Sequence, residues 1–251
     1  MFMKDKVITI SNDIINLYTI DKRNKIIDKK NVKDAVNLEN EISSENLYIL
    51  LEGEEIYIKQ LLLPNTNNEN INSIIMNKLN YIYGKKAEDI YYTYSKWRSN
   101  IKEIQIMLYC ISCDKLKITK QKNYKLQIKK VNLIQLNYIR YYKKSITEKD
   151  YIVILKHNSS IYILAYSDRK LLSNQIINEE TIESSLQFLI NKMRTYKCSI
   201  NKIYSININQ TIMQKFLQRE DKPDIINYKV INLGNITEEE IIDYYIENRR
   251  K

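Results

Sequence analysis

Short hydrophobic runs separated by polar turns dominate the chain, and the clearest set lies between Asp150 and Met193. Three β-rich runs, Tyr151–Leu155, Ile161–Tyr166 and Leu171–Ile177, are separated by tight polar segments, a pattern that predicts an antiparallel meander. The next apolar residues recur at helical spacing and form one stripe: Ile182, Leu186, Leu189, Ile190 and Met193. The segment therefore predicts three strands followed by a helix.

The chain begins with the same order of elements. Val7–Ile10, Ile14–Ile20 and Lys25–Ile27 are short β-rich runs with polar breaks between them. A helix is predicted after them from the apolar residues Val32, Ala35, Val36 and Ile42. Because the two copies lie about 140 residues apart, the sequence predicts two related halves.

A different order of elements follows the first copy. Leu47–Leu51 is predicted to be a buried strand, and a second strand from Ile56 runs up to Pro64, which ends it. Apolar residues between Ile71 and Ile82 hold helical spacing, and Gly84 is well placed as the C-cap of that helix. The sequence thus predicts a strand–strand–helix segment between the two copies.

Turn and capping residues predict the remaining elements. The polar break at residues 99–100 joins two strands into a hairpin. Asn132 is predicted to cap a helix, and Thr237 with Glu240 forms a capping box at the start of the last helix. Arg249, Arg250 and Lys251 follow that helix, and we expect a solvated, frayed end there in preference to the cytosolic edge of a membrane anchor.

Composition narrows the classes of function. A chain of 251 residues with 44% hydrophobic content is typical of a folded protein of one or two domains. No apolar run approaches the roughly 20 residues that a membrane-spanning helix needs. The net charge of +10 is spread along the chain, except at Lys115–Lys130, where lysines alternate with Tyr124 and apolar residues. This stretch leaves a nucleic-acid-binding protein open as an alternative, although a solvated basic face is favoured.

Candidate catalytic residues are sparse. His157 is the only histidine, so no metal set or nucleophile–base pair can be built around it, and we expect a turn histidine without a role. Cys110 and Cys113 have the spacing of a redox or zinc pair, but no second pair accompanies them, which favours core packing. The sequence predicts no catalytic residue and no metal site, and therefore no enzyme.

The order of the elements resembles the actin-like ATPase fold of the PilM family, which are cytosolic components of type IV pilus assembly. It is also similar to the cytosolic GspL domain of type II secretion. The strand that ends at Leu63 and Pro64, the helix from Ile71 and the hairpin from Ile90 to Tyr109 resemble the small subdomain inserted in PilM and in the divisome protein FtsA. The resemblance implies an α/β fold with two related lobes, residues 1–148 and 149–251, and an inserted α+β subdomain at about residues 52–122.

The resemblance also implies where the nucleotide loops of the family would lie. The matching positions are Ser11, Asn12 and Asp13 in the first phosphate loop, His157, Asn158 and Ser159 in the second, and residues 205–210 in the adenosine loop. None contains glycine, although the main chain must approach a bound phosphate closely. We expect Lys156 to be a strand-end lysine in solvent and Asp13 to be a turn residue. A degenerate pseudo-ATPase without a bound cofactor is predicted.

The family resemblance implies a non-catalytic scaffold at the cytoplasmic face of the inner membrane, held there through its partners. The expected partners are the cytosolic tail of a PilN-like membrane protein, the assembly ATPase, or both. In the family the tail enters a groove, expected here between the Val7–Ile49 and Ile56–Cys113 regions. Nucleic acid is not an expected partner. Two alternatives stay open: a basic nucleic-acid-binding accessory protein that uses Lys115–Lys130, and a divergent actin-like ATPase.

Overall fold

The structure is a computed structural model, and it describes residues 5–11, 14–21, 23–32, 41–42, 46–112, 127–209, 211, 213 and 228–249. The chain forms two compact units, one of residues 1–54 with 118–251 and one of residues 55–117. Both predicted lobes belong to the larger unit, so the boundary between residues 148 and 149 stays a prediction.

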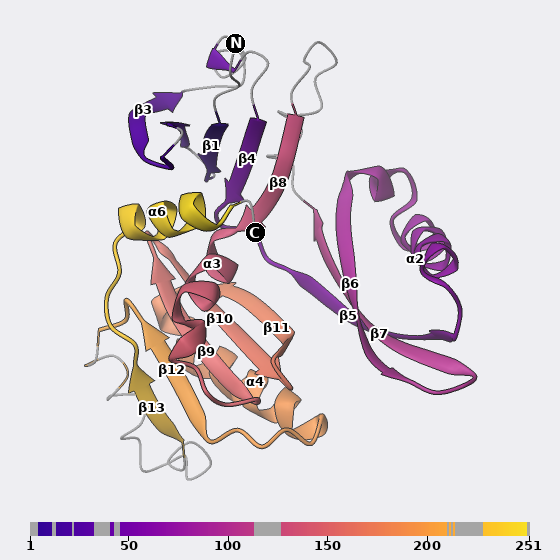
Figure 1. Cartoon of the computed structure of the whole chain (residues 1–251). Coiled ribbons are helices and arrows are strands. Elements are labelled where there is room, and N and C mark those ends of the chain that lie inside the picture. Colours follow the sequence, from indigo (N-terminus) through magenta and orange to yellow (C-terminus); the bar gives the residue numbers. More distant parts are fainter. Residues whose placement is uncertain are drawn as a thin grey trace. The chain divides into compact units, whose positions relative to one another are not determined.

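Two five-stranded sheets with corresponding strand orders build the larger unit (Figure 1). The first has the order β3-β2-β1-β4-β8 and the second β11-β10-β9-β12-β13. The strands of the first sheet are β1 (Asp5–Ile10), β2 (Ile15–Ile20), β3 (Ile26–Val32), β4 (Asn46–Leu51) and β8 (Gln127–Leu133). Those of the second are β9 (Tyr151–His157), β10 (Ser160–Ser167), β11 (Lys170–Ile177), β12 (Lys202–Ile206) and β13 (Lys229–Asn232). In each sheet an antiparallel meander is extended by two parallel strands, which confirms the predicted repeat.

Three helices of the larger unit bury part of their side chains. They are α3 (Ile134–Tyr141), α4 (Ile182–Thr195) and α6 (Glu238–Asn248). The predicted stripe of α4 is confirmed, because all five of its residues are buried. The predicted capping box of α6 is present, with the Thr237 hydroxyl accepting from the N–H of Glu240. None of the described helices is both long and apolar enough to span a membrane.

Two local predictions are wrong. Asn132 does not cap a helix: it lies in β8, and Leu133 precedes α3 without a side-chain cap. Val32 is the last residue of β3 and pairs with Ile15, instead of starting a helix. In both places the chain continues a sheet ladder that satisfies its backbone groups, so pairing with a distant strand overrides the local helix signal. Ala35 and Val36 of that predicted helix lie outside the described residues, whereas Ile42 is described and buried.

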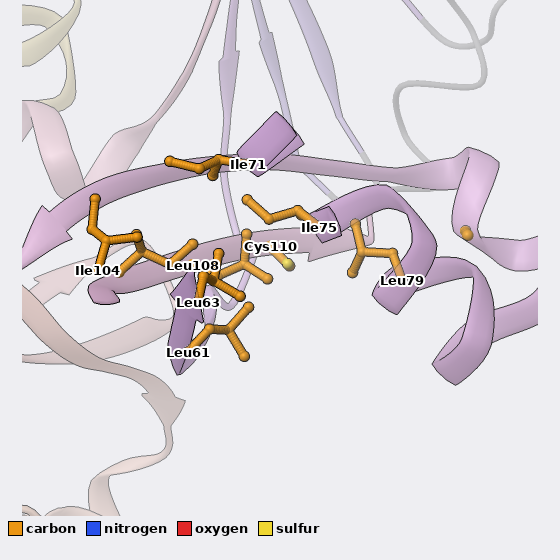
Figure 2. Packing of buried hydrophobic residues seen from close by; sticks show 10 residues of the cluster. Leu61, Leu63, Ile71, Ile75, Leu79, Ile104, Leu108 and Cys110 are labelled. Atoms are coloured by element: carbon orange, nitrogen blue, oxygen red, sulfur yellow. The ribbon is translucent and has the colours of Figure 1, made fainter. Parts of the chain in front are cut away.

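The smaller unit packs one helix on a three-stranded antiparallel sheet of order β5-β7-β6. Its elements are β5 (Tyr57–Pro64), α2 (Asn68–Tyr83), the 3-10 helix η1 (Gly84–Asp89), β6 (Ile90–Ser99) and β7 (Glu103–Ser112). Figure 2 shows the core between them, where Leu61 of β5, Ile75 of α2 and Leu108 of β7 belong to one cluster. Gly84 caps α2 with a φ of 57°, as predicted. Cys110 belongs to this core, and Cys113 lies outside the described residues.

Candidate functional site

Polar side chains at the carboxyl ends of β4 and β9 meet inside the larger unit. Glu52 directly follows β4, and its N–H donates to the carbonyl of Ile10 at the end of β1. His157 is the last residue of β9. Its Nε2 lies 3.2 Å from the Glu52 carboxylate, and both side chains are buried. The pair therefore joins the first sheet to the second at the ends of their central strands.

Tyr138 of α3 fixes the orientation of the His157 ring. The Tyr138 hydroxyl lies 3.0 Å from His157 Nδ1. Burial raises the pKa of Tyr138 well above its usual value, and the charges of Glu238 and Glu52 raise it further. Tyr138 is therefore a neutral phenol, which donates to Nδ1 or accepts from it according to the tautomer of His157, so this bond orients the ring in both cases. The predicted placement of His157 in a turn is wrong, because it is the last residue of β9 and its ring has polar partners at both nitrogens.

Two asparagines lie in turns at the edge of this polar cluster. Asn158 has a φ of 52° in the β9–β10 turn, and its side-chain amide donates to Glu52 Oε2 at 3.3 Å. Asn207 has a φ of 55° directly after β12, and its amide donates to the carbonyls of Lys156 and Ile236. Asparagine tolerates this left-handed conformation. Each asparagine thus allows a turn without glycine and fills the space beside it with a bonded side chain.

The segment that follows β4 is also fastened to the second sheet. The N–H of Gly53 donates to the Tyr162 hydroxyl at 2.8 Å. The buried side-chain amide of Gln135 donates to the carbonyl of Glu54 at 2.8 Å. Gly53 has a φ of 71°, a conformation in which a residue with a Cβ is strained. The first bond joins the exit of β4 to β10 of the second sheet, and the second bond joins it to α3.

A second carboxylate lies near this cluster. Burial raises the pKa of Glu238, at the start of α6, and the charge of Glu52 raises it further, while His157 acts in the opposite direction. The polar cluster therefore brings together two carboxylates and one histidine. An anionic phosphate chain placed here would be repelled by both carboxylates.

The raised pKa of Glu238 predicts a pH dependence of stability. Because the folded state binds this proton more tightly than the unfolded chain, Glu238 makes folding less favourable as pH rises above the unfolded value of about 4.3. We expect Glu238→Gln to be more stable than the natural protein at pH 7 and to lose this advantage below about pH 4. Urea unfolding between pH 3.5 and 8 measures the difference. A difference that does not change with pH would contradict the assignment, and the exposed Glu247→Gln serves as control.

The predicted phosphate-loop residues do not form an open loop for an anion where the structure describes them. The Ser11 hydroxyl accepts from the N–H of Ile14, so this side chain closes its own turn. Lys156 is partly exposed, as predicted, but forms an ion pair with Glu179 at 2.6 Å. Ser159 lies with Asn158 in the β9–β10 turn. Asn12 and Asp13 lie outside the described residues.

Most of the basic stretch Lys115–Lys130 also lies outside the described residues, which include only residues 127–130 of it. Lys130 is in β8, and burial lowers the pKa of its amine, with a further contribution from Arg140. Of the predicted adenosine loop, Ser205 belongs to β12 and Asn207 carries the bonds given above. Among the described residues, no group of three or more His, Cys, Asp or Glu side chains is placed to hold a metal ion.

No protein-family model and no curated protein sequence matches this chain. Among solved structures, it is similar to the cytoplasmic domain of EpsL, an inner-membrane component of the type II secretion system of Vibrio cholerae, with a TM-score of 0.55 and 8% identity over 98% of this chain and 94% of that one. A Bacteroides thetaiotaomicron protein of unknown function with an actin-like ATPase fold gives a TM-score of 0.53 and 12% identity over 98% and 96%. The chain has the actin-like ATPase fold. The predicted fold class is therefore confirmed.

A third structure with this fold, that of the PilM–PilN type IV pilus biogenesis complex, matches with a TM-score of 0.53 and 8% identity over 93% of this chain and 88% of that one. Within the actin-like fold, the sequence pattern located the β9–β10 turn and included Asn207 in the predicted adenosine loop, but missed three residues of the polar cluster. These are Glu52, Tyr138 and Glu238. The usable signal was the position of Glu52 directly after a buried strand of a repeated half.

Proposed function

We propose that this chain is a non-catalytic scaffold of a type IV pilus or type II secretion assembly platform. Its similarity to the EpsL cytoplasmic domain and to PilM extends over nearly the whole chain. PilM is solved in complex with PilN, which makes a protein partner plausible for this chain. The fold alone does not separate a scaffold from an enzyme, since unrelated functions share one architecture. The polar cluster between the sheets is the observation that favours the scaffold.

That cluster supports the absence of nucleotide binding in two ways. Glu52, His157 and Asn158 use their polar atoms on one another. A phosphate that entered there would have to break these bonds and would also meet the charges of Glu52 and Glu238. Two of the turns expected to bear on phosphates carry Asn158 and Asn207 at positive φ in place of glycine, so a Cβ occupies space through which the main chain would approach a phosphate.

The proposed partners are the cytosolic tail of a PilN-like inner-membrane protein and the assembly ATPase. The proposed location is the cytoplasmic face of the inner membrane, where the chain is held by these partners. Pull-down with synthetic cytosolic tails of the bitopic membrane proteins encoded beside this chain's gene tests the first partner. A gel shift with duplex DNA at low and at physiological salt tests the nucleic-acid alternative, whose signature is strongly salt-dependent binding.

Magnesium-ATP is expected not to stabilise this protein. A ligand present at 100 times its Kd stabilises the native state by about 2.7 kcal/mol, so 1 mM nucleotide would reveal a Kd near 10 μM as a clear rise in the unfolding temperature. We expect no rise with ATP or ADP in a thermal unfolding assay, and no heat in titration calorimetry. A nucleotide-dependent rise would instead support the divergent actin-like ATPase. The tail pull-down is a separate assay. A negative pull-down therefore leaves the nucleotide result interpretable, and the reverse also holds.

A further inference from the structure

The smaller unit has a hollow beside an edge of its sheet. β5 and the second half of α2 border a space of about 340 Å³. Its floor includes the buried side chains of Leu61, Leu79 and Leu108, which belong to the core shown in Figure 2. Tyr57 and Ile82 form part of its rim and are 60% and 44% exposed. Apolar surface therefore continues from the core to the outside along this side of the unit.

The main chain of β5 is available next to that hollow. β5 is at one edge of the β5-β7-β6 sheet, so among the described strands only β7 pairs with it. An edge strand directs alternate N–H and C=O groups away from the sheet. A segment that paired with β5 would lie about 4.8 Å from it, with alternate side chains on the side of α2. Its backbone would bond to the edge while its side chains reached the hollow.

Two lysines give the hollow its charge. Lys59 of β5 lies on the same face of the strand as Tyr57 and Leu61, and Lys78 projects from α2. Neither lysine forms an ion pair within the described part of the chain. A segment with carboxylates on both sides of an apolar side chain would complement the hollow and its two lysines.

We propose that β5 and α2 form a docking groove for an extended peptide segment of a partner protein, with apolar side chains for the hollow and acidic residues for Lys59 and Lys78. Strand addition of this kind takes its affinity from main-chain bonds and its specificity from pockets for alternate side chains. A second copy of this chain is a poorer occupant, because it would bring its own Lys59 and the terminal Pro64 to the same edge. The groove lies wholly within residues 55–117 and does not depend on the assembly platform proposed above.

Random peptides displayed on phage provide the test, selected on the whole chain and on two variants. The groove variant is Lys59→Glu with Lys78→Glu. The control variant, Lys102→Glu with Lys144→Glu, changes the net charge equally at exposed positions that do not line the hollow. We expect the natural chain and the control to select peptides that alternate apolar with acidic residues. We expect the groove variant to bind the best such peptide about tenfold more weakly or worse, since two attractive charges become repulsive.

Hydrogen exchange of the backbone amides locates the bound peptide. Added peptide is expected to protect amides of residues 57–64 in the natural chain and in the control, and circular dichroism confirms that the variants fold. Three results would overturn the proposal: peptides without an acidic–apolar pattern, binding that the groove variant leaves unchanged, or protection confined to other strands. Protection of the same amides that grows with protein concentration in the absence of peptide would assign the edge to a second copy and likewise overturn it.

Discussion

Replacing Asp5 by asparagine is expected to lower the free energy of unfolding by about 3–5 kcal/mol, because it leaves the Arg249 guanidinium buried without its counter-charge. Arg249 Nη2 lies 2.6 Å from Asp5 Oδ2, and the two side chains are only 1% and 4% exposed. Arg249 also donates to Asn24 and lies over the Tyr48 ring. The expectation of a solvated Arg249 is therefore wrong: this residue fastens the end of α6 to the first sheet.

Urea denaturation of Asp5→Asn, Arg249→Met and the double variant Asp5→Leu with Arg249→Met measures the coupling. We expect the double variant to lose less unfolding free energy than the two single variants lose together, since neither partner is then left charged in the interior. Lys30→Gln is the control, because it removes an exposed ion pair with Glu41 at 2.8 Å and is expected to change little. If Asp5→Asn lowered the free energy of unfolding as little as this control, the Asp5–Arg249 pair would not contribute to stability.

The strands and helices were largely predictable because their signals are local. The alternation of apolar runs and polar turns located β9, β10 and β11, and the helical stripe located α4. Asn67 and Gly84, at the two ends of α2, act as caps through bonds to residues nearby in sequence. A fold built twice from the same meander and parallel strands is therefore visible as a repeated pattern, even where identity to known structures is about one residue in ten.

The candidate site was less predictable because its contacts join residues far apart in sequence. Asn158 and Glu52 are 106 residues apart, and no periodicity connects them. His157 was predicted to be a turn residue because it adjoins Asn158, but its pairing with Ser160 extends β9 by two residues beyond the apolar run. Burial by α3 and by the segment after β4 then gives it partners that local sequence does not reveal.

Replacing His157 by phenylalanine is expected to lower the free energy of unfolding by about 2–4 kcal/mol, since it removes the hydrogen-bond partner of the buried Tyr138 hydroxyl and a partner of the buried Glu52 carboxylate. Phenylalanine roughly keeps the volume of the histidine ring. The lost free energy of unfolding therefore comes mainly from the polar groups left without a partner. Thermal and urea unfolding measure it. The companion Tyr138→Phe is expected to cost less, because it leaves the histidine paired with Glu52 and removes one hydrogen bond to the ring.

The same substitution tests whether the polar cluster holds the two sheets together. In a double-mutant cycle, His157→Phe combined with Glu52→Leu is expected to recover part of the loss, because the carboxylate is then removed along with its partner. Hydrogen exchange adds the spatial readout: His157→Phe should increase exchange at the ends of β4 and β9, while residues 57–112 of the other unit keep their protection. Additive effects in the cycle, together with unchanged exchange at both strand ends, would show that Glu52 and His157 are neighbours without being coupled. The proposed obstruction to phosphate binding would then rest on the two carboxylates and on the asparagine turns.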